Sequence, residues 1–77
     1  MTLNDAVAAV LSEMERARSL HPYWPLDEVH AAAIVAEEAG ELVRAVLDHH
    51  YAAKDFGECT KEAIHTAATA LRFLVGE

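Results

Sequence analysis

The chain has 77 residues, of which 53% are apolar, and it contains three glycines, two prolines and one cysteine. Six Lys and Arg against thirteen Asp and Glu give a formal net charge of −7, which repels polymeric DNA or RNA and argues against a nucleic-acid binder. A lone cysteine cannot form an internal disulfide, and the sequence shows neither a secretion signal nor a membrane-length apolar run. We therefore expect a cytoplasmic protein without a membrane partner.

The first predicted helix runs from about Asn4 to Leu20. Thr2 and Asp5 have the spacing of a capping box, and Asn4 is a competing N-cap. An apolar stripe at helical spacing is formed by Ala6, Val7, Val10, Leu11, Met14 and Ala17. The helix must end within residues 21–25, because this segment holds two prolines, which do not continue a helix.

The second predicted helix has Asp27 as its N-cap and continues to about His49. The segment from His50 to Cys59 has no sustained period and is predicted to connect two helices. A third helix is expected from about Thr60 to Gly76. Its apolar face consists of Ile64, Ala67, Ala68, Leu71, Leu74 and Val75. Its opposite face consists of Glu62, His65, Thr66, Thr69 and Arg72.

These elements predict an all-α protein with one domain over residues 1–77. A single apolar core of this size supplies only about 3–5 kcal/mol, so self-association is expected to complete it. The predicted architecture is a three-helix protomer that forms a four-helix-type bundle by oligomerisation, as a homodimer or a homotetramer.

Three glutamates in the second helix, Glu37, Glu38 and Glu41, interrupt an otherwise apolar run. At helical spacing they fall within about a quarter turn of one face. Two carboxylates about 5 Å apart repel by roughly 3 kcal/mol at an effective dielectric near 20, and the only local cation, Arg44, is expected to face Glu41 alone. A bound divalent cation would offset this repulsion. The alternative is a solvated acidic face, which we disfavour because the apolar neighbours indicate a helix enclosed on most sides.

The third helix offers a second set of ligands, Glu62-x-x-His65. Residues three apart project together, and antiparallel helices can bring this pair opposite the glutamates of the second helix. A pocket rich in oxygen atoms suits Mg²⁺, with Mn²⁺ as an alternative. The predicted metal ligands are Glu37, Glu38, Glu41, Glu62 and His65.

The two motifs together resemble those of the all-α NTP pyrophosphohydrolases, or MazG-like proteins, in particular the small phage and bacterial members. Their signature is Glu-Glu-x-x-Glu on one helix and Glu-x-x-Asp on the next. The resemblance covers roughly residues 24–77. It implies a MazG-like domain that binds Mg²⁺ and hydrolyses nucleoside triphosphates to monophosphates and pyrophosphate, with a role in clearing unwanted nucleotides. It also implies that Glu38 or Glu41 orients or deprotonates the attacking water.

The chain departs from that signature at His65, which stands where the family has aspartate. Histidine is a poorer partner for Mg²⁺ than a carboxylate. His65 could ligate Mn²⁺ or another transition ion, donate to a phosphate oxygen or water, or be a satisfied histidine without a catalytic role.

Four further residues are candidates for substrate binding. Trp24 could stack on a nucleobase, although an aromatic residue before a helix more often staples a loop to the core. Lys54, Lys61 and Arg72 could bind phosphate oxygens, and Arg72 is the best of the three because it shares the Glu62 face. We expect His30 to be a partly buried core residue.

Two rival functions stay open. Glu62-x-x-His65 has the form of the ligand element in di-iron or di-manganese carboxylate bundles, and the glutamates of the second helix could complete such a site. The other rival is a non-catalytic helical dimerisation module whose acidic patch meets a basic partner.

Overall fold

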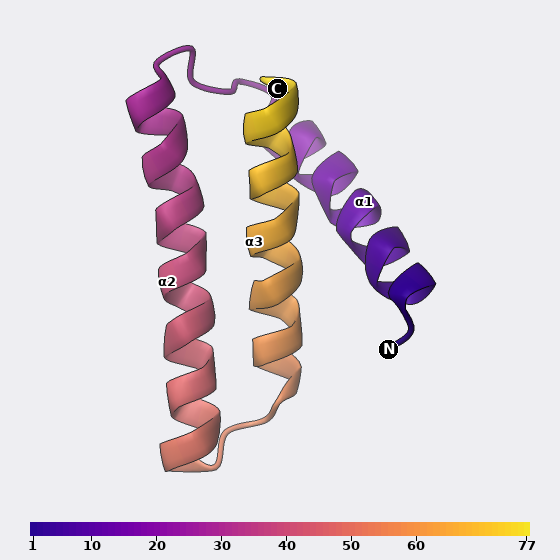
Figure 1. Ribbon diagram of the computed structural model, residues 1–77, viewed down its shortest axis with the longest axis vertical. Coiled ribbons are helices and arrows are strands. Elements are labelled where there is room, and N and C mark those ends of the chain that lie inside the picture. Colours follow the sequence, from indigo (N-terminus) through magenta and orange to yellow (C-terminus); the bar gives the residue numbers. More distant parts are fainter.

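The computed structural model describes all 77 residues and consists of three helices without a strand, which confirms the all-α prediction. The helices are α1 (Leu3–Leu20), α2 (Glu28–Ala52) and α3 (Gly57–Val75) (Figure 1). None of the three combines the length and apolar character that a bilayer crossing requires.

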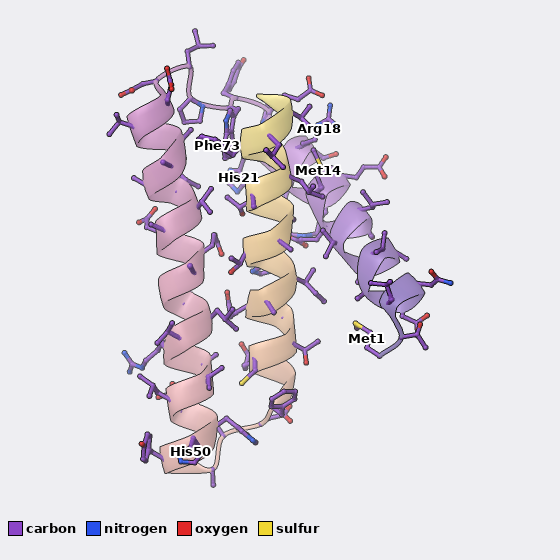
Figure 2. All side chains as sticks on the ribbon, viewed as in Figure 1. Met1, Met14, Arg18, His21, His50 and Phe73 are labelled. Carbon is purple, nitrogen blue, oxygen red and sulfur yellow. The ribbon has the colours of Figure 1, made fainter.

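Helix α3 is the central element. It runs antiparallel to α2 and lies beside it, whereas α1 crosses α3 obliquely and diverges from it toward the N-terminus (Figure 1). Helix α3 packs against both other helices, and α1 and α2 do not pack against each other. Met14 lies where α1 meets α3, while Met1 lies at the divergent end (Figure 2). The arrangement therefore leaves space between α1 and α2.

Both predicted N-caps at the first two helices are confirmed. The Thr2 hydroxyl accepts from the Asp5 backbone N–H at 3.1 Å, and the Thr2 N–H donates to the Asp5 carboxylate at 3.4 Å, which completes a capping box. Asn4 lies inside α1, so the competing cap is wrong. The Asp27 carboxylate accepts from the Val29 N–H at 3.0 Å.

The connection between α2 and α3 is shorter than predicted. Helix α2 continues three residues past His49 to Ala52, and α3 begins at Gly57 rather than Thr60. Ala53 adopts a left-handed conformation with φ of 54°, which ends α2 and lets the chain reverse within four residues. Helix α3 begins without a side-chain cap, so the sequence carries no start signal there.

The buried core is small and contains a charged residue. Only five of 77 residues are buried, namely Met14, Ala31, Cys59, Ala68 and Arg72. The Arg72 guanidinium donates to the backbone carbonyls of His21, at 2.7 Å, and Glu77, at 2.9 Å, and stacks 4.9 Å from the centre of the Trp24 ring. Arg72 thus ties the end of α1, the following loop and the end of α3 together.

Both faces of α3 are covered in part. On the polar face Glu62, His65 and Thr69 are half-buried. On the predicted apolar face Ile64, Ala67 and Leu71 are half-buried and Ala68 is buried, whereas Leu74 and Val75 are exposed. This packing places the chemically active side chains of α3 between the helices.

Large apolar side chains stay uncovered in the single chain. Its accessible surface is 5514 Å², whereas a folded protein of 8.4 kDa is expected to expose about 4,600 Å². On α2, Val43, Val46 and Leu47 are each about half exposed. Helix α2 touches only α3, so the expectation that it is enclosed on most sides is wrong for one chain.

An apolar groove of about 430 Å³ lies between the helices, and we call it the α1–α2 groove. Nine of its ten lining residues are apolar. They include Val10 from α1, Leu42 and Val46 from α2, and Ile64 from α3. This groove is the part of the single chain that most resembles an incomplete core.

We predict that Arg72→Ala lowers the free energy of unfolding by about 2–4 kcal/mol, because it removes two charge-assisted hydrogen bonds and the contact with Trp24. Arg72→Lys should recover less than half of the loss, since an ammonium does not reproduce the planar fork of donors. Urea unfolding followed by circular dichroism at fixed protein concentration measures both.

The matched control is Arg44→Ala, which removes an arginine with a 79% exposed side chain that pairs only with Asp48 on its own helix. It should change stability by about 0.5 kcal/mol or less. Equal losses for Arg72→Ala and Arg44→Ala would contradict the role of Arg72.

Candidate functional site

Three side chains from α2 and α3 meet at the centre of the bundle, and we call them the Glu–Glu–His cluster: Glu38, Glu62 and His65. One potential ligand atom from each lies within 4.8 Å of the others. Nδ1 of His65 is 3.5 Å from a carboxylate oxygen of Glu62 and 4.0 Å from one of Glu38. The fold therefore brings together Glu62 and His65 of the α3 motif and Glu38 of the α2 motif.

Helical spacing accounts for this meeting. Glu38 lies on the side of α2 that faces α3, four residues from the half-buried Ile34 and Leu42. Glu62 and His65 are three residues apart on α3 and therefore project on one side. Helix α3 is one continuous α-helix through this motif.

A third carboxylate, that of Glu13 in α1, reaches the cluster from the other side. Its Oε2 atom lies 3.5 Å from Nε2 of His65. Both of its oxygens accept from the Arg16 guanidinium, each at 2.7 Å. Glu13 is not among the site residues predicted from the sequence. The available signal was its position between Val10 and Ala17 on the inward stripe of α1.

The site carries uncompensated negative charge. The Oε2 atoms of Glu38 and Glu62 are buried and have no hydrogen-bond partner. Desolvation raises the pKa of Glu38, the charges of Glu41 and Glu62 raise it further, and His65 opposes the shift. The hydrogen bond from Arg16 holds the pKa of Glu13 below its usual range. A nearby cation would stabilise the ionised form of Glu38.

The other two glutamates of the α2 motif lie differently. Glu41 is exposed but near enough to Glu38 for its charge to shift the Glu38 pKa. Glu37 is exposed and does not belong to the cluster, because one residue step turns an α-helix by about 100°. Arg44 pairs with Asp48 at 3.3 Å rather than with Glu41, so the expectation that it faces Glu41 alone is wrong.

A cavity of about 370 Å³ adjoins the cluster on one side, and we call it the aromatic cavity. Glu38 and His65 line it together with Trp24 and Arg72. Trp24 is half-buried against the Arg72 guanidinium, which fits the predicted staple. His30 also lines this cavity but is exposed, so its prediction as a core residue is wrong.

The two predicted phosphate-binding lysines lie in separate hollows. Lys54 lines a hollow of about 380 Å³ with Glu41 and Glu62, and we call it the Lys54 hollow. Lys61 lines a hollow of about 390 Å³ between α1 and α3, with Glu13 and His65. The predicted substrate-binding residues therefore surround the cluster but do not converge on one point.

The donor set of the cluster fits a divalent cation. Two carboxylate oxygens without partners and one imidazole nitrogen face a common point, which is the mixed oxygen and nitrogen environment that Mn²⁺ and related ions accept. Mg²⁺ would use the carboxylates and complete its shell with water or phosphate oxygens.

Comparison of the chain with models of protein families, with curated proteins and with solved structures found no match. The function is therefore inferred from the geometry of the site and from the glutamate motif.

We predict that Glu38→Gln stabilises the metal-free protein at neutral pH. An unfolded glutamate titrates near 4.5, and folded Glu38 titrates higher. Between these two values the folded state holds more protons, so the free energy of unfolding falls as the pH rises through this range. Glutamine removes that decline and can donate to Glu62. A gain of about 1 kcal/mol corresponds to roughly 4–8 °C in Tm for a domain of this size.

Thermal unfolding between pH 4.5 and 8 in the presence of a chelator measures this effect. Glu37→Gln is the matched control, because it removes the neighbouring charge on the exposed side of α2. A steeper loss of stability with pH in Glu38→Gln than in the unmodified protein would contradict the prediction.

Proposed function

We propose that the protein is a metal-dependent nucleoside triphosphate pyrophosphohydrolase that converts (d)NTPs to (d)NMPs and pyrophosphate. The observation that carries this proposal is the Glu–Glu–His cluster, in which two buried carboxylate oxygens lack partners and face one imidazole nitrogen. The resemblance of Glu37-Glu38-x-x-Glu41 and Glu62 to the MazG-like motifs supports the same reaction.

The residues around the cluster divide the chemistry between them. When bound, a divalent cation would neutralise triphosphate oxygens and activate the water that attacks the α-phosphorus. Glu38 and Glu62 would hold that ion. Glu41, which is exposed beside Glu38, would orient the attacking water and accept its proton, and pyrophosphate would leave.

The spaces on the two sides of the cluster suggest how a nucleotide would lie. The aromatic cavity contains Trp24 and adjoins Glu38 and His65. The Lys54 hollow shares Glu62 and contains a cationic side chain. A nucleobase in the aromatic cavity would stack on Trp24, and the phosphate chain would cross the cluster toward Lys54. Removal of unwanted nucleotides from the cellular pool is the role that we propose for this reaction.

We predict that the protein releases pyrophosphate and monophosphate from a panel of NTPs and dNTPs in the presence of Mg²⁺ or Mn²⁺. Glu38→Gln and Glu41→Gln should each lower kcat at least 100-fold, which is the range of a general base or a metal ligand. Pyrophosphate release at saturating metal ion, together with chromatographic identification of the monophosphate, measures this.

Two further variants make the assay specific. Glu15→Gln, on an exposed part of α1, should leave turnover unchanged. Glu37→Gln tests whether activity depends on the whole sequence motif or only on the Glu–Glu–His cluster, because Glu37 belongs to the motif but not to the cluster. We expect at most a few-fold effect for Glu37→Gln. Absence of turnover with every nucleotide and ion would sink the hydrolase proposal.

A second candidate function is a di-metal carboxylate bundle that binds iron or manganese. It is favoured by the approach of Glu13, which brings carboxylates from all three helices around His65. Oxygen-dependent absorbance of the iron-loaded protein without nucleotide turnover would support this alternative over the hydrolase. The non-catalytic alternative would require that neither metal ions nor nucleotides bind.

We also infer that a helix of a second copy fills the α1–α2 groove and completes a four-helix-type bundle. The single chain exposes about 900 Å² more than expected for its mass, and one partner in a standard interface buries about 800 Å². The groove is apolar and adjoins the exposed Val46. A homodimer is the smallest assembly that would cover it.

We predict that Val46→Glu converts the dimer to a monomer, because a carboxylate in the covered groove would lose its hydration. Leu47→Glu is the matched control, since Leu47 is equally exposed on α2 but does not line the groove. Light scattering after size exclusion measures the mass. A dimer that survives Val46→Glu but not Leu47→Glu would place the partner on the outer face of α2 instead.

A further inference from the structure

We propose that His65 binds the metal ion through Nδ1, that Glu13 positions the imidazole from the opposite side, and that the site consequently prefers Mn²⁺ to Mg²⁺. This inference rests on the proposed metal site and specifies which ion it takes. It concerns the two features that distinguish the site from an all-carboxylate motif, a histidine ligand and a glutamate supplied by α1.

The two ring nitrogens of His65 face different carboxylates. Nδ1 is directed toward Glu62 and Glu38, at 3.5 and 4.0 Å, and these are the residues whose Oε2 atoms have no partner. Nε2 is directed toward Glu13, at 3.5 Å. A cation placed among the three carboxylate and imidazole atoms of the cluster therefore meets Nδ1, and Nε2 points away from it.

Glu13 is itself held in place. Arg16 donates through Nε to one oxygen and through its terminal nitrogen to the other, each at 2.7 Å. The second oxygen is also the atom nearest to Nε2 of His65. Paired hydrogen bonds between a guanidinium and a carboxylate restrict the orientation of the carboxylate. Arg16 and Glu13 thus form a support that reaches the ring from α1.

An ion bound through Nδ1 requires the tautomer of His65 whose proton lies on Nε2, the nitrogen that faces Glu13 at 3.5 Å. A proton on Nε2 would donate to Glu13, and the lone pair of Nδ1 would then be free for the ion. Metal-binding histidines commonly donate their other N–H to a carboxylate, and loss of such a partner lowers metal affinity about 10–100-fold. The proposal gives Glu13 this role and makes it a positioning residue.

The ion preference follows from the nitrogen ligand. Mg²⁺ prefers a rigid shell of oxygen atoms and retains water, whereas imidazole suits transition ions and the carboxylates suit Mn²⁺ as well. Replacement of an oxygen donor by Nδ1 therefore favours Mn²⁺ relative to Mg²⁺.

The test measures direct binding of Mn²⁺ to the full chain without nucleotide, by electron paramagnetic resonance of the free ion, with Mg²⁺ as competitor. Glu13→Leu should weaken Mn²⁺ binding about 10–100-fold. Glu13→Gln should restore most of the affinity, since its amide oxygen still accepts from Nε2. His65→Asp should lower the ratio of Mn²⁺ to Mg²⁺ affinity about tenfold or more. Glu15→Gln is the control on α1 and should bind both ions normally.

A second readout separates positioning from a structural role. Nitrogen NMR of the protein loaded with Mg²⁺, which is diamagnetic, should find His65 with its proton on Nε2, and Glu13→Leu should reduce the population of this form at the same Mg²⁺ concentration. Arg16→Gln provides a milder variant in case Glu13→Leu does not fold, because the Arg16 side chain is 54% exposed. It should weaken Mn²⁺ binding a few-fold.

The inference fails if Glu13→Leu and Arg16→Gln bind Mn²⁺ as the unmodified protein does, or if His65→Asp keeps the same ion ratio. Binding that prefers Mg²⁺ would also overturn it, even if Mg²⁺-dependent pyrophosphate release were observed. Conversely, tight Mn²⁺ binding that depends on Glu13 and His65 would support it even if no nucleotide were hydrolysed.

Discussion

The mutual repulsion of carboxylates around His65 is the constraint on which the rest of the structure depends. Glu38 and Glu62 each bring a buried oxygen without a partner to the contact between α2 and α3. Two such charges in a partly desolvated space cost several kcal/mol unless a cation or a proton lies between them. The small core has little free energy to spare for that cost. A cation that bound only the folded protein would offset this cost by its binding free energy.

Helix α3 carries two residues of the cluster and is also the helix against which α1 and α2 pack. Both faces of this central helix are partly covered, so its polar residues Glu62, His65 and Arg72 take up part of the interior. Arg72 is satisfied by backbone carbonyls and by Trp24. Apolar side chains are exposed on α2 and line the α1–α2 groove. The single chain therefore combines a partly polar interior with an uncovered apolar surface.

Much of the fold could be predicted because it depends on residues close together in the sequence. The site could be predicted only in part, because it also depends on contacts between distant residues. The caps at Thr2 and Asp27 involve residues two or three positions apart, so they could be read directly. Ala53 has no residue-type signature for its left-handed conformation, and the helix ends near it were misplaced. Helical spacing correctly placed Glu62 and His65 on the side of α3 that faces Glu38. Their roles as metal ligands are still predictions. Glu13 could not be placed because its approach depends on how α1 crosses α3, an angle that local sequence does not encode.

The oblique crossing of α1 has a consequence for dynamics. Helices α1 and α2 each pack against α3 alone, but α1 crosses α3 obliquely, whereas α2 lies beside α3 along its length (Figure 1). Local unfolding proceeds through cooperative units, and the helix with the less extensive packing opens at the lower free energy. Detachment of α1 would remove Glu13 while Glu38, Glu62 and His65 stayed on the paired helices. Amide exchange in α1 would therefore also report how often Glu13 separates from His65.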